Sequence, residues 1–225
     1  MGALISGDKM IDLHTHSILS DGELIPSELV RRAYVAGCSA IAVTDHVDHS
    51  NIDTVLSGIV KVSKVLNRYW DIYVIPGVEI THVPVEVFSE LTMYARKNGA
   101  KIVVAHGESP VEPVIAGTNA AAIEAGVDIL AHPGAILGND ARLAAEKGVY
   151  LELTCRKGHS KTNRHVFDLA RETGAKLVLN TDAHSPEDIF TPEKRDELLR
   201  SLTDSEDITA AIIRNSEDIA GKLRT

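Results

Sequence analysis

The sequence predicts an α/β fold, a TIM-like barrel in which parallel strands alternate with helices. Seven short runs rich in aliphatic and β-branched residues recur along the 225 residues, and helical patterns fill the stretches between them. A hydrophobic content of 44% is ample for one large core, and no linker interrupts the pattern, so we expect a single domain over residues 1–225. The seven runs cover residues 10–16, 40–46, 72–80, 101–106, 129–132, 149–154 and 176–182.

The stretches between the runs carry helix signals. The first predicted helix opens at Pro26 and ends before Gly37, as proline at the first helical turn and glycine after the last one favour. The second, over residues 52–66, places apolar residues at steps of three and four, which indicates one buried stripe. The remaining predicted helices cover residues 84–98, 139–147, 162–173 and 205–222.

Two segments between runs lack helical periodicity. Residues 107–118 contain several turn-forming residues, and residues 185–193 form a second long loop at the same end of the barrel. Long loops inside a compact domain are often functional, so we expect residues 107–118 to form a flap over a site. The alternative is an ordered surface loop.

Polar side chains follow the predicted strands at their carboxyl ends. In a parallel barrel these ends converge on one mouth, where active sites lie. Six of the ten histidines are found there, although random placement would scatter them over helices and loops. The set consists of Asp12, His14, His16, Asp45, His46, Glu79, His106, His132, Asp182 and His184.

Histidine combined with carboxylates, without paired cysteines, suits Zn²⁺, Mn²⁺ or Fe²⁺. Eight or more ligands exceed what one ion can use, and Glu79 can bridge, so we expect two or three divalent transition-metal ions. Metal ions held close together activate water and stabilise an in-line displacement at phosphorus. Hydrolysis of a phosphate ester is therefore the expected reaction.

The formal net charge of −9 argues against a protein that binds nucleic acid without sequence preference. Positive charge is local instead: Arg156, Lys157 and His159 follow the sixth run and are interpreted as a clamp for a substrate phosphate, with a solvated loop as the alternative. The expected partner is a small phosphorylated substrate, and nucleic acid is expected only as a nucleotide or short oligonucleotide. Nothing in the sequence indicates an oligomeric state.

No apolar run approaches the ~20 residues of a membrane-spanning helix, so no membrane partner is expected. Cys38 and Cys155 lie in apolar surroundings and are expected to be free thiols in a reducing compartment, which favours the cytoplasm.

Six motifs in this order resemble those of the PHP family, the polymerase and histidinol phosphatase superfamily. They are DLHTHSILSDG (12–22), VTDH (43–46), GVE (77–79), VAHGE (104–108), AHPG (131–134) and NTDAH (180–184). The resemblance covers essentially the whole chain and implies a distorted (β/α)₇ barrel with a trinuclear metal centre.

The resemblance also implies the ligands of each ion. The first is held by His14, His16, Glu79 and Asp182, the second by Glu79, His106 and His132, and the third by Asp21, His46 and His184. Asp21 stands where some relatives have histidine, which could shift the preference toward harder ions. Asp12 and Asp45 are interpreted as carboxylates that fix imidazole tautomers from outside the ligand set.

The leading interpretation is a phosphomonoesterase, with histidinol phosphate as one candidate substrate. In this reaction Arg156 and His159 offset charge on the phosphoryl oxygens, while Asp21 or His184 serves protonation of the leaving group. The alternatives are a nucleotide or oligonucleotide phosphoesterase, including an exonuclease, and a non-catalytic RNA-binding barrel of the ribonuclease P type.

Overall fold

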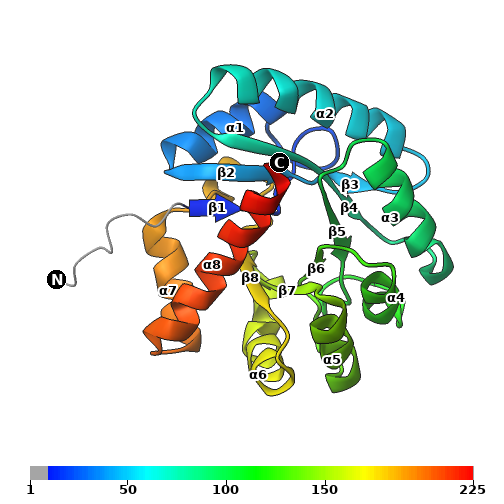
Figure 1. The fold of residues 1–225 in the computed structure, drawn as a ribbon, viewed down its shortest axis with the longest axis vertical. Helices are drawn as coiled ribbons and strands as arrows, with labels where there is room; N and C mark the ends of the chain where they lie inside the picture. The colour runs from blue at the N-terminus through cyan, green and yellow to red at the C-terminus, as the bar shows by residue number, and fades with distance from the viewer. Residues whose placement is uncertain (1–9, 225) are drawn as a thin grey trace.

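Seven parallel strands form the wall of a nearly closed barrel in the computed structural model, which describes residues 10–224 (Figure 1). Residues 1–9 and 225 of the expected domain lie outside the described part, and the extent of the domain stays a prediction. The sheet order is β1-β2-β4-β5-β6-β7-β8, and the short β3 pairs with β4. The strands are β1 (Met10–Asp12), β2 (Cys38–Val43), β3 (His46–Val47), β4 (Tyr73–Ile80), β5 (Ile102–His106), β6 (Ile129–Ala131), β7 (Tyr150–Thr154) and β8 (Leu177–Asn180).

The helices surround the strands, with α1 and α2 on the side opposite α5 and α6 (Figure 1). They are α1 (Pro26–Val35), α2 (Ile52–Tyr69), α3 (Phe88–Lys97), α4 (Thr118–Glu124), α5 (Gly138–Lys147), α6 (Asn163–Thr173), α7 (Pro192–Leu202) and α8 (Glu206–Leu223). The prediction of a TIM-like α/β barrel is confirmed, and each of the seven predicted runs overlaps one of the barrel strands. The helices α4 and α7 and the strand β3 were not predicted. None of the helices in residues 10–224 is long and apolar enough to cross a bilayer.

The strands are buried on both faces, as expected when helices cover a parallel sheet. Along β5, Ile102 and Val104 point into the barrel, whereas Val103 and Ala105 pack against the helices. The interior cluster also includes Ile219 and Ala220 of α8, which contacts both β1 and β8. The apolar interior is thus sealed by α8, and the polar chemistry is left to the opposite mouth.

The barrel closes where its first and last strands end. The bond from His16 N–H to the carbonyl of Ala183 is 2.9 Å long, and the one from Asp182 N–H to the carbonyl of His14 is 3.0 Å. These bonds bring the segments after β1 and β8 side by side. Two separate groups of predicted ligands therefore meet at this seam.

Candidate metal centre

The carboxylate of Glu79, at the end of β4, lies at the middle of the mouth and is fully buried. Five histidines surround it: two from the segment after β1, one from β3, one from the end of β5 and one directly after β6. Around Oε2 lie His14 Nε2 (3.3 Å), His16 Nε2 (3.4 Å) and His46 Nδ1 (2.8 Å), and around Oε1 lie His106 Nδ1 (3.3 Å) and His132 Nε2 (3.6 Å). Each oxygen thus faces its own set of nitrogens, which is the arrangement that a bridging carboxylate requires.

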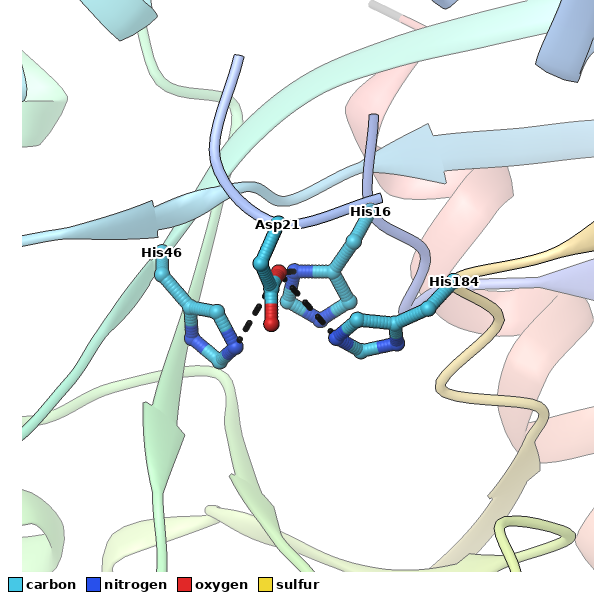
Figure 2. A group of neighbouring side chains, drawn as sticks. All are labelled: His16, Asp21, His46 and His184. Carbon is cyan, nitrogen blue, oxygen red and sulfur yellow. Dashed lines mark ion pairs between the residues drawn. The ribbon is translucent and has the colours of Figure 1, made fainter. Parts of the chain in front are cut away.

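All nine predicted ligands belong to compact groups, within each of which the ligand atoms lie no more than 4.8 Å apart. These groups include His14 with His16 and Asp182, His14 with Glu79 and His132, His46 with Glu79 and His106, and His16 with Asp21, His46 and His184. The last group gathers around Asp21, whose Oδ1 lies 3.2 Å from His184 Nε2 and 3.6 Å from His46 Nε2 (Figure 2). The structure thus adds His16 to the three residues expected around the third ion.

The polar atoms of this mouth fit a group of cations. Buried atoms of five of the predicted ligands have no hydrogen-bond partner among the described residues, and such atoms normally cost about 1–3 kcal/mol each when nothing satisfies them. They are Glu79 Oε1 and Oε2, His16 Nδ1, His106 Nδ1, His132 Nδ1 and His184 Nε2. His106 Nε2 also makes no hydrogen bond, but it lies 3.0 Å from Oε2 of Glu112. Imidazole and carboxylate donors without thiolate suit divalent transition metals.

Burial and neighbouring charges shift the pKa values of two carboxyl groups in the mouth. Burial by itself raises the pKa of Glu79, but the rings of His14 and His46 outweigh it and hold this pKa well below its usual range. Burial raises the pKa of Asp182 to about 7, because the opposing influence of His14 is too small to offset it. The carboxylate of Glu79 is therefore anionic, whereas the carboxyl group of Asp182 ionises only at a pH near neutrality.

Backbone strain marks two of the predicted ligands. His132 follows β6 with φ of 29°, and Asp182 follows β8 with φ of 55°. Residues other than glycine in this left-handed region cost of the order of 1–3 kcal/mol and cluster at functional sites. The two strained side chains lie close together, with His132 Nε2 3.6 Å from Asp182 Oδ2.

The expectation for Asp12 and Asp45 was wrong. Asp12 accepts bonds from the hydroxyl and N–H of Thr181, and Asp45 accepts bonds from Ser17 and Ser20. Neither carboxylate accepts a hydrogen bond from an imidazole among the described residues. Both instead brace the loops that carry the ligands.

Glu152, on β7, has the role that was expected of those two aspartates. Its Oε1 lies 2.8 Å from His14 Nδ1 and also accepts a bond from Asn180, while Oε2 accepts one from the N–H of His132. The bond at Nδ1 leaves His14 Nε2 facing Glu79. A charged residue between the outward-facing Leu151 and Leu153 of a fully buried strand was a signal that the sequence reading missed.

Glu112, in the predicted flap, is the second residue that was missed. Its Oε2 lies 3.0 Å from His106 Nε2 and 3.3 Å from His82 Nε2, and its Oε1 lies 3.4 Å from His159 Nε2. The contact with His106, above all, lowers the pKa of Glu112 to about 2. No pattern in the sequence distinguishes this carboxylate from an ordinary loop residue.

Only two of the three residues of the predicted phosphate clamp lie at the mouth. Arg156 and His159 line a cavity of about 290 Å³ at the mouth, together with Asp21, His46, Asp182 and His184. Arg156 donates to the carbonyl of Asp182 over 3.2 Å and contacts the ring of His184. Lys157 is exposed and lies outside the described lining of this cavity.

The chain is similar to several known proteins. The PHP domain pattern matches residues 12–161. An uncharacterised protein of Methanocaldococcus jannaschii is 48% identical over 184 residues, which cover 81% of this chain and 84% of that protein. A 5′-3′ exoribonuclease of Haemophilus influenzae is 40% identical over 73 residues, but they cover only 32% of this chain and 24% of that enzyme.

Solved structures share the fold. A chain in the structure of archaeal ribonuclease P with mature tRNA superimposes with a TM-score of 0.71 at 20% identity, covering 95% of this chain and 91% of that one. The histidinol phosphate phosphatase of Lactococcus lactis, solved with zinc, L-histidinol and phosphate, has a TM-score of 0.59 at 18% identity, covering 86% and 94%. At these identities the likeness concerns the fold.

Proposed function

The chain belongs to the PHP domain family, and from this premise we propose that its mouth is a multinuclear metal centre that hydrolyses a phosphate ester. The observation that carries the proposal is Glu79, because its two oxygens face separate sets of imidazole nitrogens. One ion would be held by His14, His16, Glu79 and Asp182, another by Glu79, His106 and His132, and a third by Asp21, His46 and His184. The donor set favours zinc, manganese or iron.

When bound, such ions lower the pKa of water from 15.7 to roughly 7 and neutralise phosphoryl oxygens, which is the chemistry that ester hydrolysis needs. The side chains around the cavity supply the rest. Arg156 and the buried His159 would bind the outer phosphoryl oxygens, since both line the cavity. Asp21, half exposed at the rim, and His184 would orient the group that protonates the departing alkoxide.

We favour a phosphomonoester as substrate. The cavity of about 290 Å³ accommodates a phosphate with a small organic group, and the flap residue Glu112 forms part of its lining. The histidinol phosphate phosphatase that shares the fold supports histidinol phosphate as one member of the panel to be tested.

A nucleotide or oligonucleotide substrate is the second candidate, and the exoribonuclease similarity over 73 residues favours it. A non-catalytic RNA-binding role is less well supported. The ribonuclease P likeness concerns the fold, and the formal net charge of −9 opposes binding to a polyanion.

The experiment combines metal analysis with a substrate panel. Protein purified without chelator is expected to carry more than one equivalent of transition metal, and added Mn²⁺ or Zn²⁺ should support phosphate release from small monoesters. Release of mononucleotides from short oligoribonucleotides would instead favour the second candidate. Protein that neither carries nor binds these ions would contradict the metal centre itself.

A further inference from the structure

We propose that Glu112 positions His106, so that closure of the loop over residues 107–117 completes one of the ion sites. The inference rests on the proposed metal centre and concerns a residue outside its ligand set. Under this proposal the loop contributes to ion binding. An open loop would leave that ion weakly held.

The argument begins with a comparison of two histidines. His14 presents Nε2 to Glu79 and Nδ1 to Glu152, at 3.3 and 2.8 Å. His106 presents Nδ1 to Glu79 and Nε2 to Glu112, at 3.3 and 3.0 Å. Each ring therefore stands between the central carboxylate and an outer one.

The outer carboxylate selects the tautomer. A neutral imidazole has one N–H and one lone pair, and a carboxylate that faces one nitrogen favours the proton there. The lone pair is then left on the nitrogen that faces the ions, and such outer partners also raise the basicity of the ligand. By this reasoning Glu112 leaves the lone pair of His106 on Nδ1, the nitrogen 3.3 Å from Glu79 Oε1, where it would be available to a bound ion.

The two outer carboxylates differ in how firmly they are held. Glu152 belongs to a barrel strand and is fully buried, whereas the side chain of Glu112 is 34% exposed and belongs to the loop. The base of that loop is fixed, because Glu108 Oε1 accepts bonds from the N–H groups of Gly117 and Asn119. The contacts of the Glu112 carboxylate hold the tip of the loop at the mouth.

The second oxygen of Glu112 extends this fastening across the cavity. It lies 3.4 Å from His159, which belongs to the segment after β7 and lines the same cavity. One loop carboxylate thus contacts a proposed ion ligand on one wall and a proposed phosphate-binding residue on the other. Loop position, ion binding and the substrate side are physically connected through it.

The test measures metal retention and needs no substrate. Zinc-loaded Glu112→Ala is titrated with a competing chelator and compared with the wild type and with Glu86→Gln, which removes the same charge from an exposed residue after β4. One ion should be released at about 10- to 100-fold lower chelator concentration from Glu112→Ala, and the others should be unaffected. Glu112→Gln retains an acceptor oxygen and should restore part of the affinity.

Hydrogen exchange supplies a second measurement that does not depend on loaded enzyme. Amides of residues 107–117 should exchange faster in metal-free Glu112→Ala than in metal-free wild type, while those of β4 and β7 should be unchanged. Identical chelator curves for Glu112→Ala and wild type would overturn the proposal.

His82→Ala separates positioning from direct coordination. His82, His106 and Glu112 together lie close enough to hold an ion of their own. Under our proposal His82→Ala retains every ion, whereas loss of one ion from that variant would assign Glu112 to a separate site and contradict positioning. A wild-type protein that binds no zinc would instead refute the metal centre, and the inference with it.

Discussion

The imidazole of His14 and the carboxylate of Glu152 meet over 2.8 Å, although 138 residues separate them in the chain. Both side chains are fully buried. The contact joins the end of β1 to β7, on the wall of the barrel beside Asn180 of β8. It fixes a ring of the proposed metal centre from the side that faces away from Glu79.

Replacing Glu152 by Gln should therefore weaken both the fold and ion binding. The new amide turns one acceptor into a donor among groups that all donate, and an unsatisfied buried group costs on the order of 1–3 kcal/mol. Urea unfolding of metal-free protein should show that loss. The control is Glu146→Gln, an exposed change on α5 that should leave the unfolding free energy unaltered. Equal stability of the two variants would contradict the role given to Glu152.

Replacing Glu79 by Gln should remove more metal than replacing one histidine. Both Glu79 oxygens are assigned to ions, whereas His132 is assigned to one. Metal analysis after gel filtration should find Glu79→Gln depleted by two equivalents and His132→Gln by one. An equal loss from both variants would show that Glu79 does not bridge.

Replacing Arg156 by Ala should lower kcat/KM toward the true phosphoester without removing metal. A lost charge-assisted bond to the phosphoryl group corresponds to about 2–3 kcal/mol of transition-state stabilisation. Because Arg156 also contacts His184, metal content must be measured beside the kinetics. Lys157→Ala, which alters an exposed neighbour, is the matched control. Unchanged kinetics in Arg156→Ala would support the alternative interpretation, that this segment is a solvated loop.

Gly134 should resist substitution more strongly than Gly126. Both residues have left-handed φ, 63° and 70°, which costs an L side chain roughly 1–2 kcal/mol. A Cβ on Gly134 would lie 1.9 Å from the carbonyl oxygen of Glu108, at the base of the flap, whereas nothing lies within 4 Å of one on Gly126. The unfolding free energy of Gly134→Ala should fall clearly below that of Gly126→Ala. Matching values would indicate that the backbone at Gly134 moves without penalty.

The predictable part of the site follows from barrel geometry. His106 and His132 end or follow strands whose carboxyl ends must meet, so their approach to Glu79 could be inferred from sequence. Glu112 could not be inferred, because its contacts depend on the path of a loop without periodic structure. Asp12 was misjudged because a strand end can point toward a neighbouring Thr181 as readily as toward a ring.

The unpredicted helices have weak local signals. The helix α4 has seven residues, too few for an apolar stripe to repeat. The helix α7 is highly charged and buries only Leu199 and Leu202 of its eleven residues. In both, packing against the barrel stabilises a helix that local sequence hardly specifies.

The seam between the segments after β1 and β8 has a consequence for biosynthesis. His14 and His16 leave the ribosome early, but Asp182 and His184, the residues beside them in the folded seam, are made last among the ligands. At a synthesis rate of 5–20 residues per second, Asp182 and His184 are made on the order of ten seconds or more after the two early histidines. If the mouth binds ions as proposed, their full complement is therefore captured only after β8 has been made, and a chain truncated before β8 would lack Asp182 and His184 beside its first histidines.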